Sequence, residues 1–551
     1  MKKIFYLTAA VAMAFGVLTS CEKFLDVTPE GSPTTDTYFT NDQQSINATG
    51  QLYYYLGNGD AMFGREIYWE QAGAGDIVWG RTRGYNTLST RLYTGDESPL
   101  RDCFSKIYAA IAKSNWVIKS LLDKQKNTTL TEIETRSLGE AYFFRAFYHL
   151  YAAYRYGVGT QGVPFCRYED FEGDYDFSIP PQQATVMDNY KYIIEDLDKA
   201  ESLLPLFESY SAEDRGRAHK AAAAAYKAKT YAYWACWDSS QWQNVITEVN
   251  KLETTYGRDL APTFGTVFSY DLADFWNKEY IFAFASDGGT PGAGSELPGV
   301  MWENKGWGKY NGWGQNKPSL GIYDEMAKDN VNGVKNDRLA WSILEYGDKF
   351  NYFGETKSFC SSADNEAGFA IFKFQHAITA SDDPVADGYV CSNGDWPTFR
   401  INLPLIRFAD CLLLRAEAYL ANGNNASAMQ DINRIRRRSN LKEITSCSWK
   451  DLYHERRCEL AFEFSDHLYD CKRWAKSGAA EIKELAIKEL EGIQKVRKYA
   501  QRDDPASSWV ESEYQDTGTH HTAWEDKQIA FPYPPQQVKN SQGALTQNPG
   551  Y

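Results

Sequence analysis

The stretch of sequence that decides the fold runs from Leu403 to Trp474, and its first half reads LPLIRFADCLLLRAEAYLANGNNASAMQDINRIRRR. Apolar residues recur there at steps of three and four, which places them on one face of a helix. The first such face contains Ile406, Ala409, Leu413, Ala416 and Leu420, and the second contains Ala428, Ile432 and Ile435. Alanine in these faces lets two helix axes approach closely, so the pattern predicts a packed helical hairpin.

The ends of these helices are also marked in the sequence. Asn422 and Gly423 both tolerate the left-handed backbone that closes a helix, and Asn425 is the predicted cap of the next one. A third, longer helix is expected from Glu455 to Trp474.

Helix pairs of this kind recur earlier in the chain. Residues 220–234 and 242–252 form a second predicted pair, and residues 139–156 and 190–203 form a third. A helix, a short turn and a second helix make the unit of tetratricopeptide repeats, and one unit cannot bury its apolar face alone. The chain is therefore predicted to be mainly α, with about four stacked tetratricopeptide-like helix pairs.

The first residues have the features of a secretory signal. Lys2 and Lys3 precede an apolar run from Ile4 to Leu18, which is too short to span a membrane permanently. Residues 1–20 are predicted to be the signal peptide. The sequence Leu-Thr-Ser before Cys21 resembles a bacterial lipobox, which makes Cys21 the lipidated first residue of the mature chain. The alternative is a secreted protein in which this cysteine is coincidental.

Charge and cysteine content narrow the possible functions. The chain has 58 basic and 73 acidic residues, a net charge of −15, which argues against nucleic acid as a partner. The basic run 434–438 is read as a helix face, either solvated or paired with Glu455, Glu459 and Glu463.

Nine cysteines follow Cys21 without a Cys-x-x-Cys pair, so most are expected to be buried thiols.

The segments between the helices define the expected organisation. Residues 21–39 lack periodicity and form a tether, residues 40–259 form a helical part, and residues 404–551 contain the last helices and a tail. Residues 260–403 are rich in loops, with strands expected at 280–285 and 369–374. Long loops without secondary structure are usually functional, so this part is predicted to bind the ligand.

Aromatic side chains are unusually abundant, at 15% of residues with 16 tryptophans, and gather in two glycine-punctuated segments. Sugar rings expose C–H faces that lie on indole and phenol rings, while polar groups at the edges bind hydroxyls. The aromatics could instead pin the loops to the scaffold. The candidate ligand-binding residues are Trp69, Asp76, Trp79, Arg81 and Tyr85 in the first segment and Trp302, Trp307, Tyr310 and Trp313 in the second.

The sequence contains only weak matches to catalytic, cofactor-binding and metal-binding motifs. Residues 157–162 have the spacing of a dinucleotide-binding turn, but they follow a helix instead of a strand, so they are read as a helix terminator. The seven histidines show no metal-ligand spacing. No catalytic residue, cofactor or metal is therefore predicted. Paired carboxylates of a glycoside hydrolase stay an alternative, because 73 acidic residues always supply candidate pairs.

Several short motifs resemble the SusD/RagB family of outer-membrane lipoproteins. They are CEKFLD at 21–26, EAYFFRAFY at 140–148, GVPF at 162–165, IRFAD at 406–410, RAEA at 415–418, INRIR at 432–436, ERRCELAFE at 455–463, Arg473-Trp474, and LTQNPGY at 545–551. These motifs belong to the scaffold, so they identify no ligand residue. They extend from Cys21 to Tyr551, so the resemblance covers the mature chain.

The resemblance implies a fold of four tetratricopeptide-like pairs carrying a loop-rich part. It also implies a lipid-anchored, surface-exposed protein of the outer membrane that captures glycans without cleaving them. Such a protein would deliver the glycan to a SusC-like TonB-dependent transporter. Some similar proteins take peptides, which leaves a peptide-capturing RagB-like protein as a further alternative.

Overall fold

The computed structural model of the chain describes residues 38–57, 62–78, 86–170, 181–269, 271, 274–285, 297–302, 312–352, 354–359, 367–376, 382–383, 385–387, 390, 398–464, 467–492, 494–501, 504–513 and 523–551. The predicted signal peptide, Cys21 and the tether up to residue 37 lie outside these ranges. No helix in the described ranges is both long and apolar enough to cross a lipid bilayer.

The fold is mainly α, as predicted. The helices of the first part are α2 (Asp42–Tyr54), α3 (Asn86–Thr90), α4 (Ser98–Gln125), α5 (Glu132–Tyr156), α6 (Val186–Leu203), α7 (Lys220–Trp234), α8 (Trp242–Thr254) and α9 (Phe264–Val267). Those of the second part are α10 (Leu320–Ala327), α11 (Asp337–Ser342), α13 (Phe408–Ala421), α14 (Asn425–Arg438), α15 (Trp449–Glu459), α16 (His467–Trp474), α17 (Ala480–Glu491) and α18 (Pro535–Asn540).

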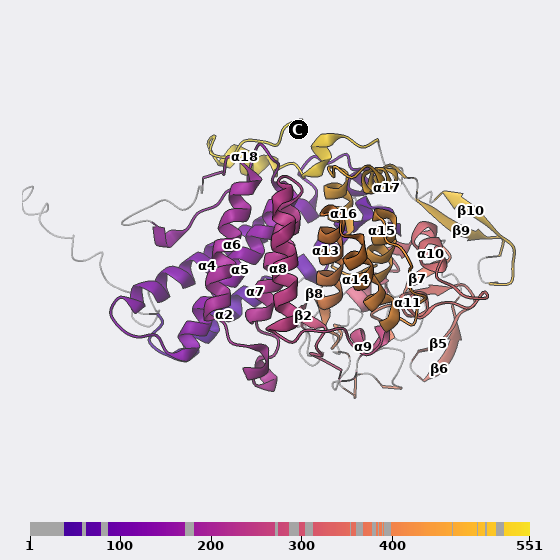
Figure 1. Ribbon diagram of the computed structural model, residues 1–551, viewed down its shortest axis with the longest axis horizontal. Coiled ribbons are helices and arrows are strands. Elements are labelled where there is room, and N and C mark those ends of the chain that lie inside the picture. The colour runs from indigo at the N-terminus through magenta and orange to yellow at the C-terminus, as the bar shows by residue number, and fades with distance from the viewer. Residues whose placement is uncertain are drawn as a thin grey trace, which may run out of the picture.

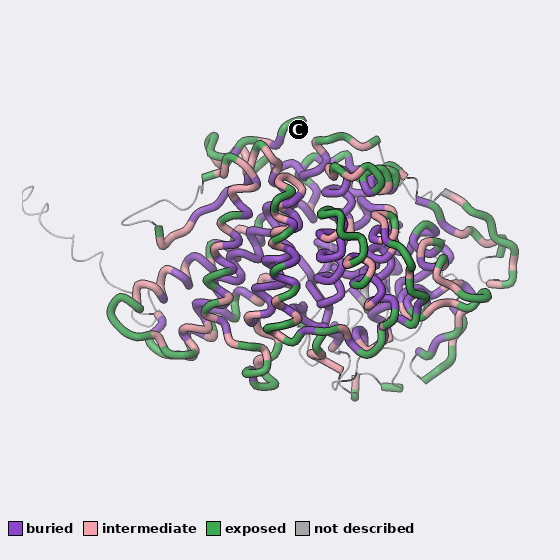
Figure 2. The backbone as a smooth tube through the Cα atoms, viewed as in Figure 1, coloured by how far each residue is buried: buried purple, intermediate pink, exposed green. Residues whose placement is uncertain are grey.

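The long helices stand side by side across the molecule (Figure 1). Helix α5 packs on α6, α7 on α8, and α13 on α14, which confirms the three hairpins expected from the sequence. Helix α8 also packs on α13, although the loop-rich residues separate the two helices in the chain. The scaffold is therefore continuous, and the buried residues form a broad core through its centre (Figure 2).

Local signals set the ends of α5. Thr131 caps its first turn, and Glu134 completes a reciprocal capping box with the backbone of Thr131. Gly157 follows the last helical residue with an extended backbone, at a φ of −89° and a ψ of 147°. A Cβ atom at this position would lie 2.5 Å from Cγ2 of Val186 and 2.6 Å from the carbonyl oxygen of Ala153. Glycine is thus needed here for a close approach between α5 and α6, in agreement with the reading as a helix terminator.

The described strands form five two-stranded antiparallel sheets. The pairs are β1 (Ile77–Val78) with β3 (Lys317–Pro318), β2 (Tyr280–Phe284) with β8 (Leu403–Arg407), β4 (Ile343–Glu345) with β7 (Phe369–Ile371), β5 (Lys349–Tyr352) with β6 (Glu355–Ser358), and β9 (Lys495–Tyr499) with β10 (Trp509–Glu513). The predicted strands at 280 and 369 are therefore present, although both are shorter than expected.

Two details of the deciding stretch differ from the prediction. Residues 403–407, which include Ile406 of the first predicted helix face, form strand β8, and α13 begins only at Phe408. The strand is favoured because its backbone pairs with β2. The cap of α14 is Asn424, whose side chain accepts from the backbone of Ser427, one residue before the expected cap.

The prediction of one long helix from Glu455 to Trp474 is wrong, because α15 ends at Glu459 and α16 begins at His467. The buried ammonium group of Lys373 donates to the carbonyl oxygens of Glu459 and Ala461, at 3.0 and 2.9 Å. These carbonyls are satisfied without a continuing helix, and Phe462 turns the chain with a φ of 65°. Lys373, nearly ninety positions away in the sequence, thus provides the hydrogen bonds that allow α15 to end at Glu459.

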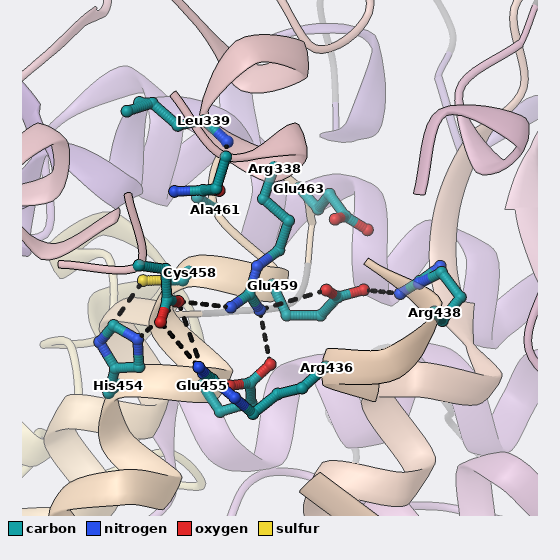
Figure 3. A network of polar contacts seen from close by, with 12 residues as sticks. Arg338, Leu339, Arg436, Arg438, His454, Glu455, Cys458, Glu459, Ala461 and Glu463 are labelled. Atoms are coloured by element: carbon teal, nitrogen blue, oxygen red, sulfur yellow. Dashed lines mark hydrogen bonds and ion pairs between the residues drawn. The ribbon is translucent and has the colours of Figure 1, made fainter. Parts of the chain in front are cut away.

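A network of buried arginines and carboxylates holds α14 and α15 together (Figure 3). Arg436 pairs with Glu455 at 2.9 Å, and Arg438 pairs with Glu459 and with Glu279. This confirms the predicted pairing of the basic run for Glu455 and Glu459. Glu463 instead binds Arg407, at 2.7 Å.

The same network fixes the charge of Glu459. Burial alone would raise the pKa of this carboxyl, but Arg438, Arg407 and Arg338 outweigh burial and lower the pKa to about 2. The seven cysteines in the described residues are thiols outside any disulfide, and six of them are buried, as expected from the sequence.

Candidate functional site

Strands β1 and β3 bring the two aromatic segments of the sequence together. Val78 pairs with Lys317, and Ile77 pairs with Pro318. Ser319 reinforces the junction: its backbone N–H donates to the carbonyl oxygen of Asp76 at 2.9 Å, and its hydroxyl donates to that of Gly75 at 2.6 Å. The chain that continues to Trp79 therefore starts beside the chain that follows Trp313. Sequence patterns had marked these segments separately, more than two hundred residues apart.

Arg65 links the same two segments through its guanidinium group. Its Cζ atom lies 5.8 Å from the ring centroid of Trp69 and 5.2 Å from that of Trp313. Both distances are within the range of a cation–π interaction. The Trp313 side chain is only partly buried, and Gly314 turns the chain directly after it with a φ of 57°. Of the three candidate aromatics that the structure describes, Trp69, Trp302 and Trp313, only Trp313 is therefore partly accessible to solvent.

Trp69 and Trp302 are core residues, each with 1% of its surface exposed. Trp302 stacks on Phe374 with 5.4 Å between ring centroids and makes a T-shaped contact with Tyr68 at 5.2 Å. A sugar needs an open ring face, so we correct the assignment of these two tryptophans from ligand platforms to supports of the segments that carry the site.

Asp76 is also buried and does not offer its carboxylate to solvent. Its Oδ1 atom accepts a hydrogen bond from Nε of Arg457 at 2.7 Å, and its Oδ2 atom lies 3.2 Å from Nε2 of His467. Burial raises the pKa of the Asp76 carboxyl, although Arg457 and His467 oppose this effect. Asp76 therefore anchors the base of the first segment, which corrects its predicted role in binding hydroxyls. Trp79, Arg81, Tyr85, Trp307 and Tyr310 lie outside the described residues.

Sequence reasoning missed polar residues beside Trp313. Gln315 is fully buried, and neither atom of its amide has a hydrogen-bond partner among the described residues. Asn316 follows in the left-handed region with a φ of 42°, which asparagine tolerates better than most residues. Like Asp76, Gln315 therefore supports the segment from inside, and no local pattern in the sequence marks it as buried.

Two grooves in the described part of the scaffold are formed by other elements. One, of about 480 Å³, lies between α7, α8, α13, α15 and α16, and Trp237, Trp242 and Trp449 line it. The other, of about 280 Å³, lies between α4, α5 and α18, with Tyr108 and His149 in its wall. Both grooves contain aromatic rings, so each is an alternative place for a ligand that stacks on aromatic side chains.

The architecture defines a helical-repeat scaffold protein whose inserted segments carry aromatic side chains. The chain belongs to the SusD/RagB family. The model of the SusD family matches residues 278–551, and the family described as starch-binding and associating with the outer membrane matches residues 23–232.

Related proteins agree with this assignment. The chain is 23% identical over 497 residues to a SusD-like protein of Bacteroides ovatus, covering 86% of this chain and 83% of that protein. The crystal structure of a SusD-like protein from Bacteroides fragilis has a TM-score of 0.73 at 20% identity and covers 94% of this chain and all of that one. The structure of a laminarin-binding SusD-like protein has a TM-score of 0.64 at 20% identity, with 93% of this chain and 100% of that one covered.

Proposed function

We propose that this protein captures oligosaccharides or polysaccharides at the cell surface without cleaving them. The observation that carries this proposal is the pairing of β1 with β3, which joins the two aromatic segments at their bases. The partly exposed ring of Trp313, held beside Arg65, supports it. The laminarin-binding relative supports the choice of a glycan as ligand.

In the proposed site, the platforms are the aromatic rings that follow β1 and precede β3. Indole and phenol rings bind the apolar faces of sugars, and the guanidinium of Arg81 binds hydroxyl groups at the edges. The buried tryptophans contribute by holding the backbone of the segments in place. The proposed ligand contacts are Trp79, Arg81, Tyr85, Trp307, Tyr310 and Trp313.

The glycan is proposed to pass to a SusC-like TonB-dependent transporter in the outer membrane, with this protein attached through lipid on Cys21. The matched family's description as associating with the outer membrane supports this location. Each buried CH₂ of an acyl chain contributes about 0.8 kcal/mol to such attachment. Copurification from outer membranes with a large barrel protein would support the partnership. Purification of the lipidated protein without one would contradict it.

The test of binding is isothermal titration of the soluble chain, starting after Cys21, against plant, fungal and host polysaccharides and their oligomers. We expect saturable binding to one class, with the glycan recovered uncut. Trp313→Ala should weaken this binding about two- to tenfold, because one aromatic contact contributes about 0.5–1.5 kcal/mol. Trp449→Ala, in the 480 Å³ groove of the scaffold, is the matched control and should bind normally. Loss in Trp449→Ala with full binding in Trp313→Ala would place the ligand in the groove instead.

Two other functions give different results in the same experiment. A glycoside hydrolase would release reducing ends from the polysaccharide over hours. A peptide-capturing protein would bind oligopeptides and no glycan.

A further inference from the structure

A histidine, a cysteine and two carboxylates converge at the base of the first aromatic segment. His467 and Cys471 lie four residues apart on α16, so their side chains share one face of the helix. Glu489 reaches them from α17, and Asp76 reaches them from the residue before β1. Cys471, Glu489 and Asp76 are buried, and the His467 side chain keeps 13% of its surface exposed.

The distances between the ligand atoms resemble those of a metal centre. The Nε2 atom of His467 lies 3.2 Å from Oδ2 of Asp76 and 2.6 Å from Oε1 of Glu489. The Sγ atom of Cys471 lies 3.7 Å from Nε2 of His467 and 3.7 Å from Oε2 of Glu489. In tetrahedral zinc sites, bond lengths near 2.1 and 2.3 Å give separations of about 3.4 Å between nitrogen or oxygen ligands and about 3.6 Å to sulfur. The imidazole and Glu489 would have to move apart by about 0.8 Å. Asp76 would have to move toward the other ligands, because the group with all ligand atoms within 4.8 Å of one another contains His467, Cys471 and Glu489 without it.

We propose that His467, Cys471, Glu489 and Asp76 bind one divalent cation, and that zinc fits this donor set best. Zinc accepts nitrogen, sulfur and carboxylate ligands together, whereas calcium and magnesium take oxygen. Among the residues that the structure describes, His467, Cys471 and Glu489 are the group found with ligand atoms all within 4.8 Å of one another.

The charges around the site match a divalent cation. With Cys471 as thiolate, the four ligands carry three negative charges, and the adjacent guanidinium of Arg457 offsets one of them. The remaining charge of −2 is neutralised by one Zn²⁺, so the metal would leave no uncompensated charge in a buried place.

Groups outside the site orient the carboxylates, as is usual around bound zinc. Nε of Arg457 donates to Oδ1 of Asp76 at 2.7 Å and leaves Oδ2 directed at His467. The backbone N–H of Gly75 donates to Oε1 of Glu489 at 3.3 Å, and the hydroxyl of Tyr453 donates to Oε2. A cation here would tie α16 and α17 to the segment that continues to Trp79. The proposal does not depend on the identity of the ligand at the aromatic site.

Metal content provides the test. The mature chain, starting after Cys21, is freed of metal with chelator, mixed with excess zinc and passed through a desalting column before elemental analysis. We expect about one zinc per chain in the wild type. His467→Ala and Cys471→Ser should retain less than about a tenth of this amount, because removing a ligand weakens zinc binding steeply.

Cys458→Ser is the matched control, because Cys458 also follows a histidine by four residues, with its Sγ 3.8 Å from Nδ1 of His454 (Figure 3). It should retain zinc like the wild type. Absence of retained zinc in the wild type, or equal retention in all variants, would overturn the proposal.

A second measurement uses the wild type alone, in case the ligand variants fail to fold. Cobalt added to the metal-free protein should produce the near-ultraviolet absorption of a cobalt–thiolate bond, and zinc should abolish it. Zinc should also protect Cys471, but not Cys458, from alkylation as followed by mass spectrometry, and raise the Tm. A cobalt spectrum without thiolate absorption, together with unchanged alkylation of Cys471, would refute ligation by this cysteine.

Discussion

Two neighbouring arginines in the last turn of α14 offer a direct test of what holds the scaffold together. Arg438 is 3% exposed at its side chain and binds Glu279 and Glu459, which are both fully buried. Arg437 is 54% exposed and binds Glu443, which is 48% exposed. We therefore compare Arg438→Ala with Arg437→Ala, which remove the same side chain from adjacent positions.

The structure sets the expected magnitudes. Removing one partner of a buried ion pair costs about 3–5 kcal/mol, because the remaining charge stays buried without compensation. Arg407 still faces Glu459, at 2.8 Å, and also binds Glu279, so we expect the lower end, about 3 kcal/mol, for Arg438→Ala. An exposed pair contributes about 0–1 kcal/mol, which is the expectation for Arg437→Ala.

The assay is urea unfolding at pH 7, with the free energy of unfolding followed by circular dichroism and by tryptophan fluorescence. The pKa of Glu459 is lowered, so its contribution is present above the unfolded value of about 4.3 and is lost as pH falls toward about 2. The difference between wild type and Arg438→Ala should therefore shrink below pH 4. Equal losses in the two variants, or a loss under about 1 kcal/mol in Arg438→Ala, would refute the reasoning.

Two further predictions concern stability. Gly157→Ala should lower the free energy of unfolding by about 1–3 kcal/mol in urea, because the new Cβ atom would lie 2.5 Å from Val186. Gly478→Ala is the control and should be neutral, because no atom lies within 4 Å of the new Cβ atom. Similar losses in both variants would contradict the close approach at Gly157. Lys472 is buried 3.8 Å from the ring centroid of Phe531, and burial lowers its pKa well below the ordinary value. The free energy of unfolding of the wild type should therefore rise as the pH approaches the pKa of lysine in the unfolded chain, about 10.4. Lys472→Met should remove this rise and should unfold at a higher urea concentration than the wild type at pH 7. An unchanged pH profile would contradict a buried, titrating Lys472.

Helix pairing could be predicted because its signals are local. The stripe around Leu413, the stop at Gly423 and the terminator at Gly157 lie within a few turns of the residues they organise. The long helix after Glu455 was predicted wrongly for the opposite reason. Its end depends on Lys373, which the periodicity of residues 455–474 cannot reveal.

The proposed metal site likewise depends on contacts between residues that are far apart in the sequence. The spacing of the histidines indicated no metal site, and the pair of His467 and Cys471, four residues apart on one helix, is too common a pattern to predict one. Only the tertiary structure adds Glu489 and Asp76, the latter nearly four hundred residues away.

The sequence by itself determined the class of fold and the two segments rich in aromatic residues. It could not decide which of their rings face a ligand, because a tryptophan has the same composition and similar local patterns in a core or on a surface. The tertiary structure decided that Trp69 and Trp302 are buried and that Trp313 is partly open beside Arg65. Burial depends on which distant segments pack over a ring, and the pairing of β1 with β3 exists only after the whole scaffold has brought them together.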